Sequence, residues 1–330
     1  MSFLANKRIL FIAPSFHNLQ FKILNEMIEF GAEVDYYDER PKNNFLTKFL
    51  IRLKLKKIIA KQIYNYYKNI LLETRKKHYD YVFFINIEAI NEKILYKFRE
   101  QNKDSIFILY MWDSLELKNI SDKMLSFFDR KFTFDYRDAK NRNMQLLDLF
   151  YTKEYKNTKM KIKYDISFIG TIHGDRYKIL KEIKEKAEKQ DLKVYYYLFM
   201  PSRIMFWGRK IFDRRFKGLK YNDVQFDSLD SHRIVEIMNQ SKAIVDLSYK
   251  NQVGLSMRTF EVLGVKKKLI TTHQMVKDYD FYDKNNIEII EKNNIKINKS
   301  FLEIKYNILN ENVYKKYSLY NWIKKIFIVA

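Results

Sequence analysis

Residues 252–264 read Gln252-Val-Gly-Leu-Ser-Met-Arg-Thr-Phe-Glu-Val-Leu-Gly264, and after Val265 the chain continues as Lys266-Lys-Lys-Leu-Ile-Thr-Thr272. The pattern predicts a glycine turn, a short helix and a buried strand that ends in hydroxyl side chains. Gly254 lets the backbone approach a ligand closely, and the helix after it directs its N-terminal amides at a phosphate. This layout is typical of a nucleotide-sugar pocket.

Arg258 and Glu261 lie three residues apart and therefore share one face of the predicted helix. We expect Arg258, near the N-terminal end, to pair with phosphate oxygens, and Glu261 to accept hydrogen bonds from ribose hydroxyls. Thr259 lies between them and is predicted to bind the same nucleotide sugar, which is called the donor below.

A second phosphate-binding pattern lies upstream, where a predicted strand at residues 166–169 leads into Gly170-Thr-Ile-His-Gly174-Asp-Arg176 and then into a helix. The two glycines lack the third glycine of a full dinucleotide fingerprint, but their place between strand and helix favours a ligand site. We therefore expect Gly170 and Thr171 to contact the donor. Arg176 is predicted to pair with its diphosphate or, as the alternative, to form a surface salt bridge.

Strands and helices alternate along the chain, which favours parallel, doubly wound sheets. The polar, lysine-rich stretch 151–163 is the predicted linker. We predict an N-terminal Rossmann-like domain at 1–155, a C-terminal one at 164–312, and a last segment, 313–330, that crosses back to the first domain. The main predicted strands are residues 8–13, 32–37, 81–85 and 106–111 in the first half, and 166–169, 194–198, 243–247, 269–272 and 287–290 in the second.

Ligands of open α/β sheets bind beyond the carboxyl ends of the strands. His17 follows the first strand by four residues, and Asp113 follows the strand that ends at Met111. Each is predicted as a catalytic base that takes a proton from an acceptor hydroxyl. Trp112 is predicted to stack on an acceptor sugar. The alternatives are a surface-loop histidine at His17, an acceptor-binding carboxylate at Asp113 and a core position for Trp112.

Residues 241–290, with Asp165-Ile-Ser-Phe-Ile-Gly-Thr171 and Trp112-Asp-Ser114, resemble the bacterial capsule and lipopolysaccharide glycosyltransferases of the GT-B type, including the CgeB-like group. The resemblance runs from Arg8 to about residue 291. It implies two Rossmann-like domains facing across a cleft, with the acceptor on the first and the donor on the second.

Many retaining enzymes of this architecture carry two glutamates eight positions apart, of which the second contacts ribose. Glu261 matches the second position, but Val253 occupies the first. The resemblance therefore leaves open whether the reaction retains or inverts the anomeric configuration.

The chain carries 62 Lys and Arg against 40 Asp and Glu, a formal net charge of +22. Such a charge indicates anionic partners such as lipid headgroups, nucleic acid or phosphorylated substrates, or simply a lysine-rich solvated surface. Two segments combine basic with apolar side chains: 45–77, which has a helical pattern with an apolar and a basic face, and 203–220. Amphipathic segments of this kind can lie on an anionic leaflet. We expect a cytoplasmic protein, peripheral on the inner face of the plasma membrane.

Cysteine is absent from the sequence, which excludes disulfides, thiolate metal sites and cysteine nucleophiles. The first eight residues are too short and too polar for a secretory signal, and no apolar run approaches the ~20 residues that span a bilayer. His173 and His232 are far apart, and no carboxylate cluster has metal-ligand spacing. We therefore expect neither a metal nor a cofactor, and leaving-group charge met by helix amides with Arg176 and Arg258.

These observations predict a glycosyltransferase that moves a sugar from a nucleotide-diphosphate sugar to a surface polysaccharide or a lipid-linked glycan. One alternative is a basic nucleic-acid-binding protein, which the charge and the interleaved aromatic residues favour. No helix-turn-helix, zinc-finger or RNA-binding motif supports it, so no nucleic-acid partner is expected. A second alternative is a sugar-nucleotide-binding module without activity, because Val253 replaces the first glutamate.

Overall fold

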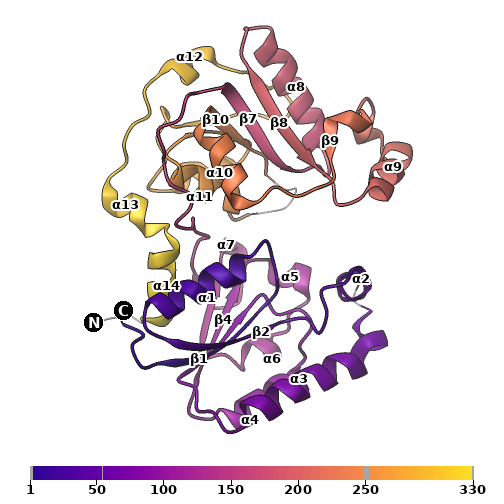
Figure 1. Ribbon diagram of the computed structural model, residues 1–330, viewed down its shortest axis with the longest axis vertical. Helices are drawn as coiled ribbons and strands as arrows, with labels where there is room; N and C mark the ends of the chain where they lie inside the picture. Colours follow the sequence, from indigo (N-terminus) through magenta and orange to yellow (C-terminus); the bar gives the residue numbers. More distant parts are fainter. Residues whose placement is uncertain (1–2, 54, 249–252, 329–330) are drawn as a thin grey trace. The chain divides into compact units, whose positions relative to one another are not determined.

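The computed structural model describes residues 3–53, 55–248 and 253–328. The chain divides into two compact units (Figure 1): unit 1 is Met1–Asp148 with Leu319–Ala330, and unit 2 is Leu149–Ser318. The division therefore falls at residue 148, whereas the predicted first domain runs to 155. Gln252, which opens the stretch quoted above, lies outside the described residues.

Unit 1 is built on a six-stranded sheet with the order β2-β1-β3-β4-β5-β6, and every pairing in it is parallel. The inner strands are nearly continuous apolar runs, as expected for a parallel sheet that is covered on both faces. The strands are β1 (Arg8–Ala13), β2 (Glu33–Asp38), β3 (Tyr81–Ile85), β4 (Ile106–Met111), β5 (Arg130–Thr133) and β6 (Gln145–Leu146).

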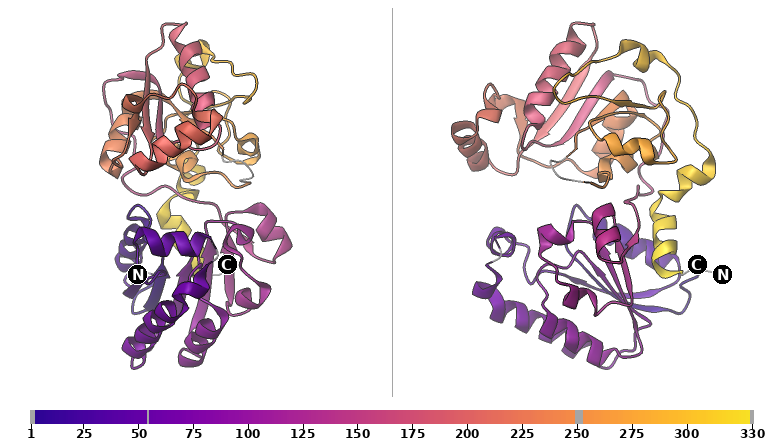
Figure 2. Two further views of the ribbon diagram at one scale, coloured as in Figure 1. Left: turned by 90° about the vertical axis from the view of Figure 1, so that its right-hand side faces the viewer. Right: turned by 180° about the vertical axis from the view of Figure 1, so that it is seen from behind.

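Helices cover both faces of this sheet (Figure 2). The longest helix has 15 residues. Four helices have six residues or fewer, and one of these four is a 3-10 turn. In chain order they are α1 (Leu19–Glu29), α2 (Phe45–Arg52), the 3-10 turn η1 (Lys56–Ile59), α3 (Ala60–Thr74), α4 (Glu92–Gln101), α5 (Leu115–Lys118), α6 (Asp122–Leu125), α7 (Tyr136–Asn141) and α14 (Leu319–Phe327).

The basic segment 45–77, read from the sequence as one helical pattern, is broken into α2, η1 and α3. Leu50 and Ile51 are buried on α2, and Ile63 and Tyr67 are buried on α3. On one continuous helix, at roughly 100° per residue, these two pairs would face in nearly opposite directions. The break lets both pairs face the core.

Helix α14 returns to unit 1 and lies beside α1 (Figure 1). The Trp322 side chain is 1% exposed, and its ring centroid lies 4.7 Å from that of Tyr110 on β4. Phe327 packs edge-on against Tyr81 and Phe83 of β3. The last helix therefore completes the hydrophobic core on one face of the first sheet.

Unit 2 has a second six-stranded parallel sheet with the order β12-β11-β10-β7-β8-β9. Its strands are β7 (Tyr164–Thr171), β8 (Val194–Phe199), β9 (Val224–Gln225), β10 (Ser241–Asp246), β11 (Lys268–Thr271) and β12 (Ile287–Ile289). Its helices are α8 (Arg176–Glu188), α9 (Arg203–Phe212), α10 (Ser231–Asn239), α11 (Met257–Gly264), α12 (Lys299–Glu303) and α13 (Glu311–Lys316), with 3-10 turns η2 (Arg214–Phe216), η3 (Tyr221–Asp223) and η4 (Gln274–Asp278).

Gly264 ends α11 at a close backbone contact. A Cβ atom at this position would lie 2.6 Å from the Tyr155 carbonyl oxygen and 2.9 Å from Cγ of Tyr151. Only glycine therefore lets the chain that enters unit 2 run directly against the end of α11.

In each sheet the chain first extends in one direction and then in the other, which creates a switch point. In unit 1 the switch lies between β1 and β3, and in unit 2 it lies between β7 and β10. Because all strands are parallel, their carboxyl ends share one edge of each sheet. The loops after β7 and β10 are therefore the first place to look for a ligand site in unit 2.

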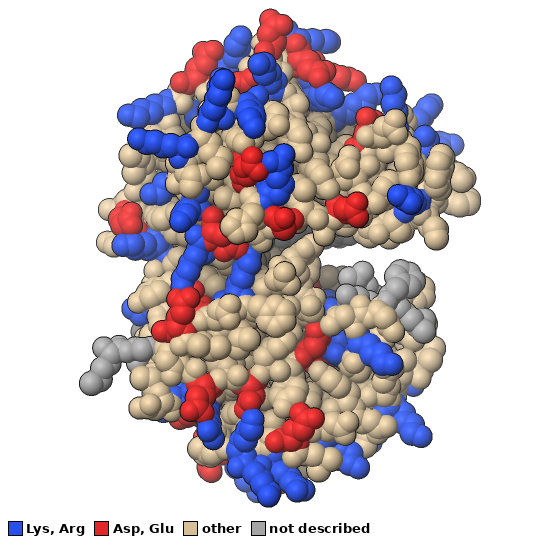
Figure 3. Space-filling view, viewed as in Figure 1, with Lys and Arg blue, Asp and Glu red and all other residues tan. Residues whose placement is uncertain are grey.

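On the face that Figure 3 shows, lysine and arginine side chains spread over both units, with acidic side chains among them. In the part of the chain that the structure describes, no helix is long and apolar enough to cross a membrane.

Candidate functional site

The loop after β7 in unit 2 is held by the guanidinium group of Arg176. Gly170 and Thr171 end the strand, and Arg176 is the first residue of α8. Its Nη1 donates to the Thr171 carbonyl at 3.2 Å, and its Nη2 donates to the Leu247 carbonyl, just after β10, at 2.8 Å. Arg176 thus connects the two strand exits that flank the switch point.

A second arginine reaches the same loop from α9. Arg209 Nη1 donates to the Ile172 carbonyl at 2.8 Å. His173 lies beside it, and burial together with the positive charges of Arg176 and Arg209 lowers its pKa to about 4. The imidazole is therefore neutral near pH 7, and the loop is an electropositive environment at the N-terminal end of a thirteen-residue helix.

His273 follows β11 at the same edge of the sheet and is 4% exposed. Its Nε2 has no hydrogen-bond partner among the described residues. Burial lowers the pKa of His273; the Asp246 charge opposes this shift, and the charges of Lys292 and Arg176 add to it. A buried ring nitrogen without a partner is uncommon in a folded protein.

Arg258 and Glu261, on α11, form an ion pair with each other. Arg258 Nη1 lies 2.7 Å from Glu261 Oε2, and the two side chains are 19% and 15% exposed. Arg258 Nη2 also donates to the Ile169 carbonyl at 3.3 Å. Burial lowers the pKa of Arg258, but the charges of Glu261, Tyr155 and Asp246 outweigh it and raise that pKa. Their roles towards phosphate and ribose stay predictions.

Asp246, at the end of β10, fixes the N-terminal end of α11. It is 3% exposed and accepts hydrogen bonds from Ser256 Oγ at 2.6 Å and from Thr259 Oγ1 at 2.7 Å. The Thr259 hydroxyl, predicted to bind the donor, is thus directed at Asp246. Gly254 is buried in the turn before the helix.

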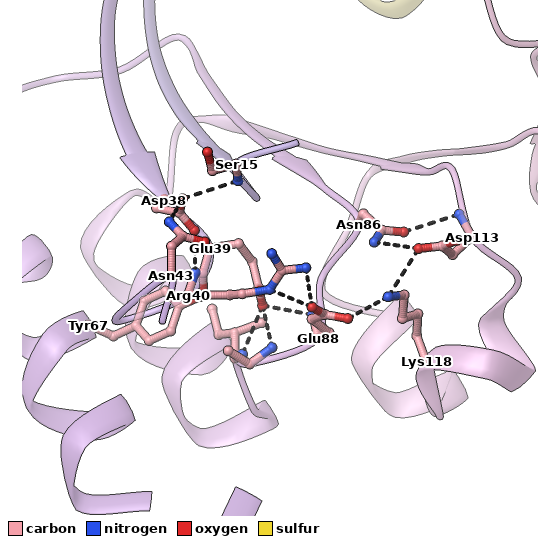
Figure 4. A network of polar contacts seen from close by, with 12 residues as sticks. Ser15, Asp38, Glu39, Arg40, Asn43, Tyr67, Asn86, Glu88, Asp113 and Lys118 are labelled. Atoms are coloured by element: carbon pink, nitrogen blue, oxygen red, sulfur yellow. Dashed lines mark hydrogen bonds and ion pairs between the residues drawn. The ribbon is translucent and has the colours of Figure 1, made fainter. Parts of the chain in front are cut away.

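In unit 1 an ionic network connects the exits of β2, β3 and β4 (Figure 4). Glu88 is 4% exposed and lies between two cations. Arg40 Nε donates to its Oε1 at 2.6 Å, and Lys118 Nζ donates to its Oε2 at 2.5 Å. Lys118 also lies 3.0 Å from Asp113 Oδ2, to which Asn86 Nδ2 donates at 3.0 Å. The predicted base Asp113 is therefore positioned by two side chains.

Glu39 lies beneath this network and is fully buried. Its Oε1 accepts from the backbone amides of Glu88, Ala89 and Ile90 at 2.7, 2.5 and 3.1 Å. Its Oε2 has no partner within the described part of the chain. Burial and the charge of Glu88 raise the pKa of Glu39 to about 7, against the effect of the backbone amides.

The other two residues predicted in unit 1 lie around Phe16. His17 is exposed in a left-handed backbone conformation, with φ of 45°, and its ring lies 4.7 Å from Phe16. The Phe16 ring lies 6.1 Å from the half-buried Trp112. Phe16 thus contacts both His17 and Trp112, and Trp112 precedes Asp113 in sequence. The catalytic and acceptor-binding roles of these residues stay predictions.

Sequence reasoning missed several residues of both sites. In unit 1 the sequence 38–41 predicts only a turn, although it contributes Glu39 and Arg40 to the network. The missed residues are Glu39, Arg40, Glu88 and Lys118 in unit 1, and Arg209, Asp246 and His273 in unit 2. Glu39, Arg40, Glu88 and His273 follow a strand within three positions, and this position was the available signal. Asp246 is the last residue of β10, whereas Lys118 and Arg209 lie on helices. Among the described residues, no group of three or more His, Cys, Asp or Glu side chains could hold a metal ion.

The chain matches no protein-family model and no curated protein sequence. Solved structures are similar to it over nearly its whole length. The apo form of the lipopolysaccharide outer core galactosyltransferase WaaB is 12% identical with a TM-score of 0.51, covering 97% of this chain and 98% of that one. HepE from Anabaena, in complex with UDP and glucose, is 10% identical with a TM-score of 0.55, covering 98% and 96%.

The UDP-GlcNAc 2-epimerase from Neisseria meningitidis, bound to UDP-GlcNAc, is 14% identical with a TM-score of 0.54, covering 97% and 98%. At sequence identities this low, the similarity to these solved structures shows the fold alone. The two parallel sheets and these comparisons together confirm two Rossmann-like domains of the GT-B fold. The narrower CgeB-like resemblance stays a prediction.

The ion pair on α11 predicts a large effect of Glu261→Ala on stability. The substitution leaves the half-buried guanidinium of Arg258 without its carboxylate, so we expect the free energy of unfolding to fall by about 2 kcal/mol. Urea denaturation followed by circular dichroism measures this. Glu100→Ala is the matched control, because Glu100 pairs with Lys103 at the same spacing but both side chains are exposed. If Glu261→Ala and Glu100→Ala lower the free energy of unfolding equally, the Arg258–Glu261 pair stabilises the protein no more than an exposed pair does.

Glu39 predicts a pH dependence of stability. Its pKa of about 7 in the folded protein lies above the ordinary 4.5, so between these values the folded protein holds a proton that the unfolded chain has released. The free energy of unfolding therefore falls as pH rises through this window, by up to about 3 kcal/mol. Glu39→Gln cannot titrate and removes this part of the fall.

The measurement is urea denaturation of the parent and of Glu39→Gln between pH 4.5 and pH 8. Glu303→Gln, at an exposed position, controls for the amide substitution itself. If the free energy of unfolding changes with pH in the same way in the parent and in Glu39→Gln, the raised pKa of Glu39 is contradicted.

Proposed function

We propose that this protein is a metal-independent glycosyltransferase that moves a sugar from a nucleotide-diphosphate sugar to a surface polysaccharide or a lipid-linked glycan. The observation that carries the proposal is the electropositive loop after β7, where Arg176 and Arg209 donate to backbone carbonyls beside His173. We place the protein in the cytoplasm, peripheral on the inner face of the plasma membrane.

The charges of this loop suit a diphosphate. Arg176 and Arg209 are held in place by neutral carbonyl oxygens, so their positive charge is not cancelled by those partners. The amides at the start of α8 add a partial positive charge. Together they would stabilise the negative charge that develops on the leaving nucleoside diphosphate, which is the task of an electrostatic catalyst.

Relatives in fold support the donor class. HepE was solved with UDP and glucose, and the Neisseria epimerase was bound to UDP-GlcNAc. Both ligands contain uridine diphosphate, so UDP-sugars are the first donors to test. Gly170 and Gly254 would allow close backbone approach, Thr171 would contact the donor, and Glu261 would contact the ribose once the donor is bound.

The acceptor would bind unit 1 at Trp112. Asp113, positioned by Lys118 and Asn86, or the nearby His17 would take the proton of the acceptor hydroxyl. The acceptor oxygen then forms a bond to the anomeric carbon, while the bond from that carbon to the diphosphate oxygen breaks. The nucleoside diphosphate leaves with the electron pair, and Arg176 and Arg209 offset its charge.

Epimerisation of a nucleotide sugar is the second candidate. The Neisseria epimerase covers as much of the chain as WaaB does, with a TM-score of 0.54 against 0.51. An epimerase needs no acceptor, since it returns a nucleotide sugar with one inverted centre. The two activities therefore differ in whether the nucleotide is released.

The donor site predicts that Arg209→Met weakens the binding of UDP-glucose at least about tenfold, because a charge-assisted contact contributes roughly 1.5–3 kcal/mol. Methionine keeps an apolar stem against Phe216, over which the guanidinium lies. Isothermal titration calorimetry measures the affinity. Arg233→Met, an exposed arginine of the same unit, is the matched control and should bind as the parent does.

Equal affinity in the parent and in Arg209→Met would contradict the site. No binding of UDP-, GDP-, CMP- or dTDP-sugars by folded protein would contradict the function. Product analysis then separates the remaining activities: released nucleotide with a glycosylated acceptor indicates transfer, and an altered nucleotide sugar without acceptor indicates epimerisation. Binding with neither product indicates a binding module.

A further inference from the structure

Helix α9 of unit 2 exposes a row of large apolar side chains. Ile204 and Phe212 are each 86% exposed, Ile211 is 70% exposed and Trp207 is 50% exposed. Residues 204, 207, 208, 211 and 212 repeat at the spacing of helical turns, so they share one face. That face is therefore apolar and open to solvent, which is unusual for a helix of a folded protein.

The opposite side of α9 is anchored in unit 2. Phe206 is 1% exposed and contacts the rings of Tyr221 and Phe226 edge-on. Arg209 donates to the Ile172 carbonyl, and Ser202 caps the helix by accepting from the Met205 amide at 3.1 Å. The apolar row is thus presented by a fixed helix and does not come from a segment that lacks its own packing.

Basic side chains lie beside the apolar row. Arg203 and Lys210 are exposed on α9, and the Lys210 ammonium lies 5.6 Å from the Trp207 ring centroid. Segment 203–220 contains seven Lys and Arg and one acid, Asp213, which is paired with Arg215 at 2.7 Å. In the space-filling view, uncharged side chains cover much of the surface at α9, with basic ones beside them (Figure 3).

We infer that α9 is a docking surface for an anionic lipid bilayer. The interface between headgroups and acyl chains accepts both parts of this surface: apolar side chains enter the acyl boundary, and lysine and arginine contact the headgroup phosphates. Nucleic acid would satisfy the charges, but it would leave Ile204, Ile211 and Phe212 in water. The chemistry therefore matches a membrane with negative charge, and it does so independently of the proposed reaction.

The experiment is sedimentation of the full chain with vesicles, without nucleotide sugar. One set of vesicles is an equal mixture of phosphatidylglycerol and phosphatidylcholine, and the other is phosphatidylcholine alone. We expect the parent to bind the anionic vesicles, to bind them more weakly as salt is raised, and to bind the neutral vesicles at least about tenfold more weakly. On binding, the emission of Trp207 should shift to shorter wavelength.

The triple variant Ile204→Ser, Ile211→Ser, Phe212→Ser should lose at least about tenfold in vesicle affinity, because its apolar contact with the acyl boundary is gone. The matched control is Ile28→Ser, Tyr96→Ser, Ile308→Ser, which removes three other exposed apolar side chains. The control should bind as the parent does. Since all six positions are exposed, thermal unfolding should be similar in the three proteins.

Three results would overturn the inference: no sedimentation of the parent with anionic vesicles, equal binding to neutral vesicles, or full binding by the α9 triple variant. UDP-glucose affinity of the triple variant, measured in parallel, keeps the two proposals apart. Donor binding without vesicle binding refutes the docking surface alone, and vesicle binding without donor binding refutes the reaction alone.

Discussion

In a parallel sheet the carboxyl ends of all strands lie along one edge. A charged side chain that is buried at this edge needs an ionic or hydrogen-bonding partner. The two units meet this requirement differently. In unit 1 the partners are opposite charges, with Glu88 between Arg40 and Lys118. In unit 2, Arg176 and Arg209 donate to neutral carbonyl oxygens. A carbonyl partner satisfies a hydrogen-bond donor without adding a negative charge, so these two arginines suit the diphosphate that the proposed reaction requires.

The Arg258–Glu261 pair shows how one spacing serves two purposes. Three residues on a helix bring both side chains to one face, which makes them suitable as neighbouring ligand contacts. The same spacing lets them neutralise each other in the absence of a ligand. Donor binding at this position would therefore exchange a contact within the protein for contacts with the donor, and the net gain would be smaller than the new contacts alone suggest.

Much of the fold could be predicted because it depends on local apolar runs. The predicted strands 8–13, 81–85 and 106–111 have the bounds of β1, β3 and β4. The break inside 45–77 depends on which side of each helix meets the core, a property of packing that the local pattern does not contain. Glu39 was missed for a similar reason, because it binds backbone amides about fifty positions further along the chain.

The position of α14 has a consequence for how the protein is made. On the ribosome, the sheet of unit 1 emerges before unit 2, but Trp322 and Phe327, which cover one of its faces, are synthesised after unit 2. All of unit 2 must leave the ribosome before that face is covered. During translation the nascent first unit therefore carries an open apolar surface at Phe83 and Tyr110, a natural place for a chaperone to bind.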